Sequence, residues 1–381
     1  MSVAMIPPSF VPQANPGAGY RALKTEIDAA VARALSSGWY ILGAEGRAFE
    51  AEYAAWLGTA RAIGCANGTD ALALALRSLG IGPGCAVAAV SHTAVATVAA
   101  IEMVGATPVL IDIDPLHYTM DPAELDAVLA HPPAGLPPIR AVIVVHLYGQ
   151  PADLAAIQAS AARHGIPVIE DCAQAHGATI GAQKVGSFTE VSCFSLYPTK
   201  NLGALGDGGV VATNDAERAD TIAALRQYGW RTHYISDSAG VNSRLDEIQA
   251  AILRAKLPHL DAGNARRQAI AVAYDGALPA ALRPVRRAGT SHVFHQYVLR
   301  VADRAAVQAD LRGRGIGTGV HYPAPVHLQP AYLDRVTLGP ARCAATEIAA
   351  REVMSLPMYP ELSDDDVARV CDGLRAVFGQ S

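Results

Sequence analysis

The chain has 381 residues, of which 51% are apolar and 17% charged, with a formal net charge of −5 at pH 7. This length and apolar content exclude a disordered protein and favour two domains built around a sizeable core. The sequence has no basic stripe, membrane-length apolar run, secretion-signal pattern or paired cysteine spacing, so we expect a cytoplasmic protein with no nucleic-acid, membrane or metal site.

Short apolar runs alternate with helical patterns from about residue 62 to 214. Runs at 85–90, 106–114 and 139–149 are each followed by a helical segment, and another run ends at Asp171. Continuous Val/Ile runs separated by helices predict a mainly parallel sheet that is covered on both faces. Such sheets bind ligands beyond the carboxyl ends of their strands, which makes the residues after each run the candidates for a site.

The pattern changes after about residue 240. Residues 242–257 predict a long helix that begins near Asn242 or Ser243, followed by a strand at 292–301 and a helix at 303–315. We therefore expect a large domain at residues 1–250, with residues 1–20 extended, and a smaller C-terminal α+β domain at residues 251–381.

The first candidate ligand site is the turn that opens the helix predicted within residues 65–80. Gly68 allows a tight turn, and Thr69 and Asp70 can cap the helix. The exposed N–H groups of a helix N-terminus bind phosphate, although an ordinary capping turn has the same sequence.

The second candidate is the pair of carboxylates that closes the strand ending at residue 171. A carboxylate in a crevice needs a partner, so Asp171 would face a cationic ring nitrogen. The alternative is that Glu170 or Asp171 only caps the next helix.

The third candidate is Lys200, one of four lysines in a chain with 26 arginines, placed between an apolar run and a glycine-rich loop. A lysine amine condenses with aldehydes once it loses its proton, and burial lowers its pKa. The alternative is a surface lysine on a turn.

Together the three candidates match the needs of pyridoxal 5′-phosphate. This cofactor requires an anchored phosphate, a carboxylate at its pyridine nitrogen and a lysine for its aldehyde. Asp171 and Lys200 follow two different strands, so a parallel sheet would bring them to one edge.

Several segments, in this order, resemble the DegT/DnrJ/StrS-type nucleotide-sugar aminotransferases: GTDALALALRSLGIGPG, GATPVLIDIDP, VIEDCAQAHGA, FSLYPTKNLGALGDGG, NSRLDEIQAAIL and GVHYPAPVHLQPAY. The resemblance runs from about residue 20 to 375. It implies fold type I of the pyridoxal phosphate enzymes: an α/β large domain with a mainly parallel seven-stranded sheet between helices, plus a smaller α+β domain.

The resemblance also implies roles for individual residues. Lys200 would hold the cofactor aldehyde and then move protons between the cofactor C4′ and the sugar carbon. Asp171 would bind the pyridine nitrogen, and Gln174 the ring hydroxyl. The other cofactor-binding residues implied are Gly68, Thr69, Asp70 and Ser195 around the phosphate, and Asn242 from a neighbouring subunit, which implies a homodimer with shared sites. The substrate-binding residues implied are Tyr40, Tyr228, Arg231, His321, Tyr322 and His327.

One position departs from the pattern of this family. Many relatives carry an aromatic residue that stacks on the cofactor where this chain has Ala94. His92 is our candidate for stacking, against Thr93 or an aliphatic cover.

The expected reaction is transfer of an amino group from L-glutamate to a nucleotide-linked keto-sugar, through pyridoxal and pyridoxamine forms of the cofactor. The chain looks most like the branch that aminates C3 of dTDP-3-keto-6-deoxyhexoses, and amination at C4 is the alternative. A sugar dehydratase of related fold is disfavoured, because relatives that dehydrate carry histidine in place of the lysine. A non-catalytic regulator is disfavoured by the absence of a basic face in the sequence.

Overall fold

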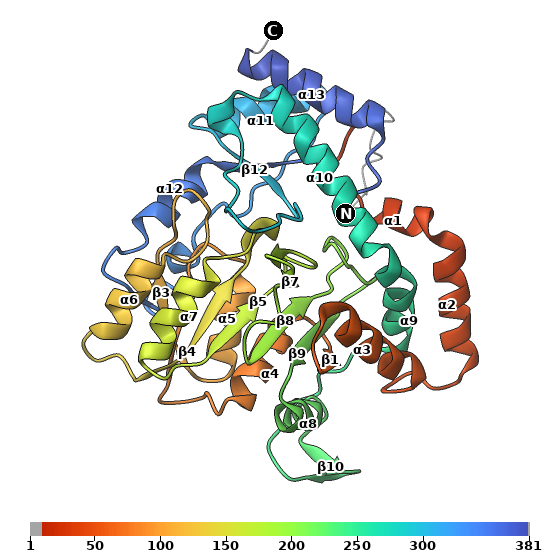
Figure 1. Ribbon diagram of the computed structural model, residues 1–381, viewed down its shortest axis with the longest axis vertical. Helices are drawn as coiled ribbons and strands as arrows, with labels where there is room; N and C mark the ends of the chain where they lie inside the picture. Colours follow the sequence, from red (N-terminus) through yellow and green to blue (C-terminus); the bar gives the residue numbers. More distant parts are fainter. Residues whose placement is uncertain (1–9, 380–381) are drawn as a thin grey trace.

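A central eight-stranded sheet organises the protein. The structure is a computed structural model that describes residues 10–379, and Figure 1 shows the sheet between its covering helices. The strand order is β1-β9-β8-β5-β4-β2-β3-β13; β9 pairs antiparallel with β1 and β8, and the other pairs of this sheet are parallel. The strands are β1 (Arg61–Cys65), β2 (Ala86–Val90), β3 (Thr107–Ile111), β4 (Ile139–Val145), β5 (Val168–Asp171), β8 (Val191–Ser195), β9 (Gly209–Thr213) and β13 (Thr337–Leu338).

The mainly parallel sheet that the sequence predicts is confirmed, with one strand more than expected. Seven strands come from residues 61–213, and β13 adds a two-residue strand parallel to β3. A strand of two residues has no periodicity to detect, so pattern analysis could not find it.

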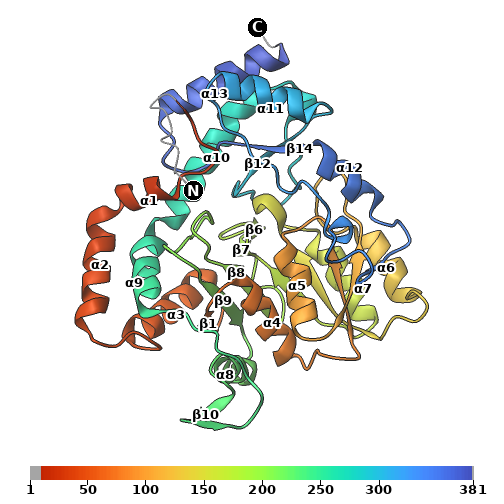
Figure 2. The same ribbon diagram turned by 180° about the vertical axis from the view of Figure 1, so that it is seen from behind.

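Helices cover both faces of the sheet, as the apolar runs predict. Along β2, Val87 and Ala89 pack into one core cluster, whereas Ala86, Ala88 and Val90 pack into another. Figure 1 shows α7 in front of the sheet, and Figure 2 shows α4 and α5 in front of the opposite face. The covering helices are α3 (Ala44–Leu57), α4 (Gly68–Ser78), α5 (Val95–Met103), α6 (Pro122–Ala130), α7 (Leu154–Arg163) and α8 (Ala216–Leu225).

The C-terminal part builds a second core around an antiparallel pair of strands. β12 pairs with β14, and α10, α11 and α13 pack with them in a separate apolar cluster. Tyr332 and Cys343 instead pack into the core of the large sheet, so the segment that carries them contacts the large sheet. The elements are α9 (Glu247–Lys256), α10 (Leu260–Ala277), β12 (Tyr297–Arg300), α11 (Arg304–Gly313), α12 (Ala344–Glu352), β14 (Val353–Leu356) and α13 (Asp364–Phe378). A domain boundary at 250/251, inside α9, stays a prediction.

Two local predictions are wrong. Residues 1–9 lie outside the described part of the chain, but residues 16–20, which we expected to be extended, belong to helix α1 (Pro16–Ala22). Asn15 caps this helix by accepting the Ala18 N–H at 3.2 Å, and proline is well suited to the first helical position.

The second error concerns the helix expected to begin near Asn242 or Ser243. It is α9, which begins at Glu247. The N–H groups of Val241 and Ser243 donate to the carbonyls of Leu225 and Arg226 at 2.8 and 2.9 Å. This pairing keeps the segment extended and overrides its local preference for a helix cap.

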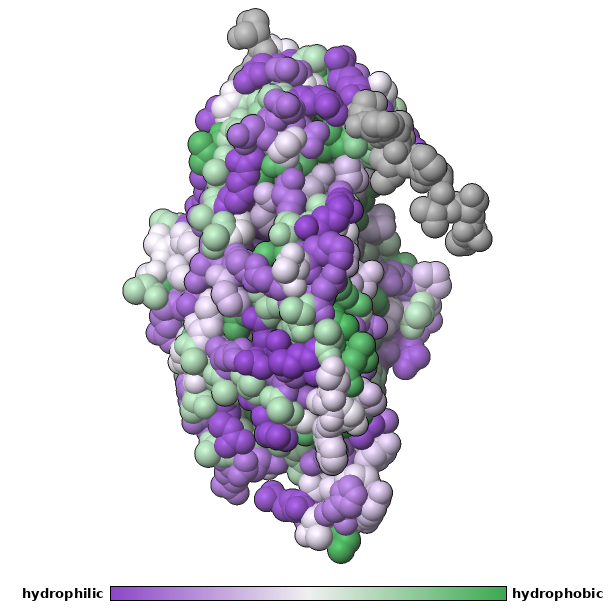
Figure 3. All heavy atoms as spheres, turned by 90° about the vertical axis from the view of Figure 1, so that its right-hand side faces the viewer, coloured by the Kyte–Doolittle hydropathy of each residue, from purple (hydrophilic) through white to green (hydrophobic). Residues whose placement is uncertain are grey.

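The remaining elements are short, apart from α2. They are α2 (Lys24–Ser36), β6 (Thr179–Ile180), β7 (Gln183–Lys184), β10 (Trp230–Thr232), β11 (Ile235–Ser236) and the 3-10 turns Leu147–Gly149, Leu257–His259, Ala280–Leu282 and Val326–Leu328. Across residues 10–379, no helix has both the length and the apolar character that crossing a membrane requires. Figure 3 shows one side of the molecule, on which hydrophilic and hydrophobic residues are intermixed.

Candidate active site

The candidate residues gather where β5 and β8 end beside the start of α4. Asp171 is the last residue of β5, Ser195 is the last residue of β8, and Gly68 opens α4. Lys200 follows β8 in the next loop. The parallel arrangement of β5 and β8 therefore brings the three sequence candidates to one edge of the sheet.

Asp171 is held as an acceptor at this edge. Its side chain is only 4% exposed, and its two oxygens accept the Thr97 hydroxyl at 2.9 Å and the Ala173 N–H at 3.1 Å. Burial raises the pKa of Asp171, although these hydrogen bonds and the charge of Lys200 oppose the rise. A cationic ring nitrogen would add the partner that keeps this carboxylate ionised.

Lys200 has the properties of a lysine that reacts with an aldehyde. Burial lowers its pKa to about 8 from the ordinary 10.5, against the opposing effect of the Asp171 charge. Because the uncharged amine is the nucleophile, a lower pKa makes Lys200 more reactive near neutral pH.

We expect the reaction of the apoprotein with pyridoxal phosphate to follow the titration of this amine. The rate of capture should rise between about pH 7 and pH 9, with a midpoint at the Lys200 pKa of about 8. Lys24 offers a comparison within the same chain. Its hydrogen bond to Asp28 raises its pKa, so a reaction at this amine would need a higher pH than a reaction at Lys200. Stopped-flow absorbance at several pH values measures the midpoint, and a midpoint near 10.5 would contradict the burial of the amine.

The start of α4 packs closely against the end of β8, and we call this turn, with Gly68 and Ser195, the cradle. A Cβ atom on Gly68 would lie 2.6 Å from the Ser195 Cβ, so only glycine fits there. The Asn67 side chain accepts the Asp70 N–H at 2.8 Å and caps α4, a role that we had considered for Thr69 and Asp70. The Thr69 hydroxyl and Asp70 carboxylate are therefore not needed for the cap, and the helix dipole favours an anion at this end.

Replacing Gly68 with alanine should close this cradle. We expect the apoprotein to lose about 1–3 kcal/mol of unfolding free energy through overpacking against Ser195, and its affinity for pyridoxal phosphate to fall. Gly276→Ala in α10 is the control, because a Cβ there meets nothing within 4 Å. Denaturant titrations and cofactor titrations measure the two effects; equal behaviour of the two variants would show that the cradle has room for a side chain.

Gln174 is oriented by its neighbours. Its Oε1 accepts the Tyr148 N–H at 2.7 Å, and its Nε2 donates to the Tyr322 hydroxyl at 2.9 Å. The amide nitrogen has a second hydrogen, which can donate to a ring hydroxyl.

These residues fit pyridoxal phosphate: a glycine-only cradle, a buried acid and a lysine with a lowered pKa. Comparison with known proteins decides the family. Residues 21–375 match the model of the DegT/DnrJ/EryC1/StrS aminotransferase family. The chain belongs to this family.

Relatives of known name agree with this assignment. The chain is 45% identical to the dTDP-3-amino-3,4,6-trideoxy-alpha-D-glucose transaminase of Streptomyces venezuelae, over 96% of this chain and 95% of that protein. It is 44% identical to the UDP-N-acetyl-3-dehydro-alpha-D-glucosamine 3-aminotransferase of Acidithiobacillus ferrooxidans, over 96% and 97%. The crystal structure of S. venezuelae DesV superposes with a TM-score of 0.92 at 43% identity, over 98% of this chain and 99% of that chain.

The structure brings two of the predicted substrate residues of this aminotransferase to the site. Tyr322 bonds to Gln174, and the carbonyl of His321 accepts the Tyr148 hydroxyl. Burial lowers the pKa of His321 to about 4, and the Lys200 charge acts in the same direction. His321 is therefore a neutral ring near Lys200 at physiological pH.

His327 is placed differently. Its Nδ1 lies 2.7 Å from the Ser91 hydroxyl, and its Nε2 lies 3.4 Å from Glu347. Both ring nitrogens thus have protein partners, so contact with a substrate stays a prediction for this residue.

His92 packs among aromatic side chains. It is 1% exposed, its Nε2 lies 2.7 Å from the Tyr148 hydroxyl, and its ring packs on Tyr118 and Tyr148. Because Asp171 and Gln174 are buried to a similar degree, burial does not decide the role of His92, and its stacking on the cofactor stays a prediction. Ala94 is only partly buried.

Four predicted residues are exposed and are not brought to Lys200 by this single chain. Tyr228 and Arg231 lie at the hairpin of β10 and β11, which projects beyond α8 at the bottom of Figure 1. Tyr40 is exposed before α3, and Asn242 lines an open pocket with Ala66 and Asp207. A role in binding stays a prediction for all four residues.

The sequence analysis missed two residues that orient the predicted ones. Thr97 donates to Asp171 from a position 74 residues away, and Tyr148 holds Gln174 with its backbone in the left-handed region (φ 60°). The sequence around Thr97 has no pattern that predicts a contact with Asp171. The residue type of Tyr148 does not predict a positive φ, which is uncommon outside glycine.

Proposed function

We propose that this protein transfers the amino group of L-glutamate to C3 of a dTDP-linked 3-keto-6-deoxyhexose, with pyridoxal 5′-phosphate as its cofactor. The observation that carries the proposal is the convergence of Asp171, Lys200 and the Gly68–Ser195 cradle at one edge of the sheet. Transamination of a nucleotide-linked keto-sugar agrees with the family and with both named relatives.

Each of these residues has one task in this reaction. Gly68, Thr69 and Ser195 bind the phosphate, Asp171 accepts the ring N–H, and the Gln174 amide donates to the ring hydroxyl. When bound, pyridoxal phosphate supplies an aldehyde that accepts the amino group and a ring that stabilises negative charge at the substrate carbon.

Lys200 holds the cofactor between turnovers and moves protons during them. With the cofactor bound, the Lys200 amine would be the group that takes a proton from the substrate carbon and delivers a proton at C4′. A pKa of about 8 suits both steps near neutral pH. Over the two half-reactions, glutamate and the keto-sugar are consumed, and 2-oxoglutarate and the amino sugar are formed.

We also propose a homodimer with shared sites. Trp39, Tyr40 and Tyr234 are large apolar side chains that are 64%, 49% and 77% exposed, and a second copy would cover such a surface. Light scattering should give twice the mass of the chain. A monomer that is fully active would contradict the shared site.

Two half-reactions test the proposed function. Adding glutamate should shift the visible absorbance band of the holoenzyme and release one molecule of 2-oxoglutarate per active site. A panel of dTDP- and UDP-linked 3-keto and 4-keto sugars then identifies the acceptor, and NMR of the product locates the amine. Amination at C4, dehydration without an amine, or no spectral response to glutamate would each contradict the proposal.

A further inference from the structure

Glu170 is a buried anion on the opposite face of β5 from Asp171. Its side chain is 0% exposed. Burial by itself would raise the pKa of Glu170, but hydrogen bonds from His146, Gly186 and Thr189 outweigh burial and hold the pKa below its ordinary value. The carboxylate is therefore ionised at neutral pH.

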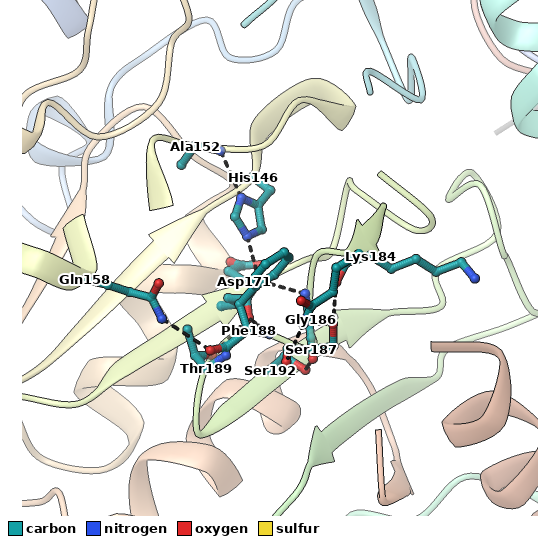
Figure 4. A network of polar contacts seen from close by, with 12 residues as sticks. His146, Ala152, Gln158, Asp171, Lys184, Gly186, Ser187, Phe188, Thr189 and Ser192 are labelled. Carbon is teal, nitrogen blue, oxygen red and sulfur yellow. Dashed lines mark hydrogen bonds and ion pairs between the residues drawn. The ribbon is translucent and has the colours of Figure 1, made fainter. Parts of the chain in front are cut away.

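Five donors satisfy this carboxylate. Oε1 accepts the N–H groups of Phe188 and Thr189, both at 3.1 Å, and the Thr189 hydroxyl at 3.0 Å. Oε2 accepts the Gly186 N–H at 2.7 Å and lies 3.1 Å from His146 Nε2. Figure 4 shows His146 and the loop of residues 186–189 converging on the end of β5.

His146 takes part as a neutral ring in one tautomer. Its Nδ1 accepts the Ala152 N–H at 3.0 Å, so its hydrogen is on Nε2 and points at Glu170. His146 follows β4 directly, two residues before Tyr148.

The same loop is joined to β8. The Ser192 hydroxyl donates to the Gly186 carbonyl at 2.7 Å, and a Cβ on Gly186 would lie 2.4 Å from the Phe194 ring. Glu170 thus joins three segments: the end of β4, which leads to Tyr148 and so to Gln174, the end of β5, which carries Asp171, and the loop of residues 186–189 that leads into β8.

A metal ion is a poor alternative for this cluster. Ligand atoms of His146, Glu170 and Cys172 lie within 4.8 Å of one another. The oxygens of Glu170 already accept five hydrogen bonds, one of them from the His146 nitrogen that would have to bind the ion. Burial also raises the pKa of the Cys172 thiol well above its ordinary value, which disfavours the thiolate that metals need.

We propose that Glu170 is a positioning residue for the amino transfer. Its carboxylate fixes the ends of β4 and β5 against the loop that leads into β8, so that the ring-nitrogen acid Asp171 and the amine of Lys200 keep the separation that one cofactor molecule spans. This inference rests on the proposed function, since it assigns Glu170 a task towards the same cofactor.

Two pairs of variants separate positioning from general stability. Glu170→Gln keeps the shape but removes the charge that five donors face. Glu124→Gln is its control, because Glu124 is also buried and accepts the N–H groups of Asp112 and Ala341, away from the site. Thr189→Val removes one donor to Glu170, a hydroxyl that also lies 3.1 Å from the Val191 carbonyl, and Thr189→Ser retains the hydroxyl.

The readouts are the dissociation constant of pyridoxal phosphate from the apoprotein, hydrogen exchange of the Gly186 to Ser192 amides, the melting temperature, and kcat at saturating cofactor. We expect Glu170→Gln to weaken cofactor binding at least tenfold, to speed exchange in the loop and to lower kcat with little change in the KM for glutamate. Thr189→Val should weaken cofactor binding about threefold, and Thr189→Ser should bind the cofactor like the wild type. Glu124→Gln should lower only the melting temperature.

The inference is overturned if Glu170→Gln and Thr189→Val bind the cofactor and turn over like the wild type, even when they melt earlier. If Glu170→Gln does not fold, the Thr189 pair decides: equal cofactor affinity of Thr189→Val and Thr189→Ser overturns it. A wild-type protein that binds no pyridoxal phosphate would instead refute the proposed function.

Discussion

Lys200→Ala should abolish amino transfer while leaving the fold intact. The variant lacks both the group that holds the cofactor and the base that moves the proton, so we expect kcat to fall at least about 10⁴-fold, or about 5 kcal/mol of transition-state stabilisation. Added glutamate and cofactor should accumulate as an adduct that turns over only slowly, and absorbance together with 2-oxoglutarate release measures this.

Lys24→Ala is the matched control for this variant. Lys24 pairs with Asp28 on the surface, where both side chains are about half exposed, and its removal should leave kcat unchanged. Wild-type turnover by Lys200→Ala would show that the base is another group.

Asp171→Asn should lower kcat by about 10²- to 10³-fold without unfolding the protein. Asparagine keeps the shape and can still accept the Thr97 hydroxyl, but it cannot stabilise a protonated ring nitrogen, so the ring loses power to stabilise negative charge. The expected loss is about 3–4 kcal/mol in the transition state, and steady-state kinetics with glutamate measures it.

The same variant separates catalysis from helix capping. Asp215 accepts the Arg218 N–H at 3.0 Å as the cap of α8, and asparagine caps a helix about as well as aspartate. Asp215→Asn should therefore be neutral. If Asp171→Asn is equally neutral, Asp171 has only a structural task.

The sequence alone predicted those elements that depend on the pattern of neighbouring residues. Continuous Val/Ile runs predicted β2 to β5, because strands buried on both faces carry no alternation. The scarcity of lysine drew attention to Lys200, and the position of Asp171 after an apolar run placed it at the edge of the sheet. In the structure Asp171 is the last residue of β5, and Lys200 lies in the loop after β8, which runs parallel to β5.

What could not be predicted depends on contacts between distant segments. The Thr97 to Asp171 hydrogen bond spans 74 residues, and the Gln174 to Tyr322 bond spans 148. The start of α9 is delayed to Glu247 by pairing of Val241 with Leu225, which a local capping signal cannot anticipate. The packing of His92 on Tyr118 and Tyr148 likewise joins segments that are distant in the sequence.

Reduction of the holoenzyme with borohydride, followed by peptide mapping, tests the central claim most directly. Hydride makes the bond between the cofactor and its lysine permanent, so mass spectrometry identifies the residue that was attached. We predict a single pyridoxyl group on the peptide that contains Lys200. Attachment at Lys24, Lys184 or Lys256, or no attachment in protein that shows the visible absorbance of the bound cofactor, would contradict the account.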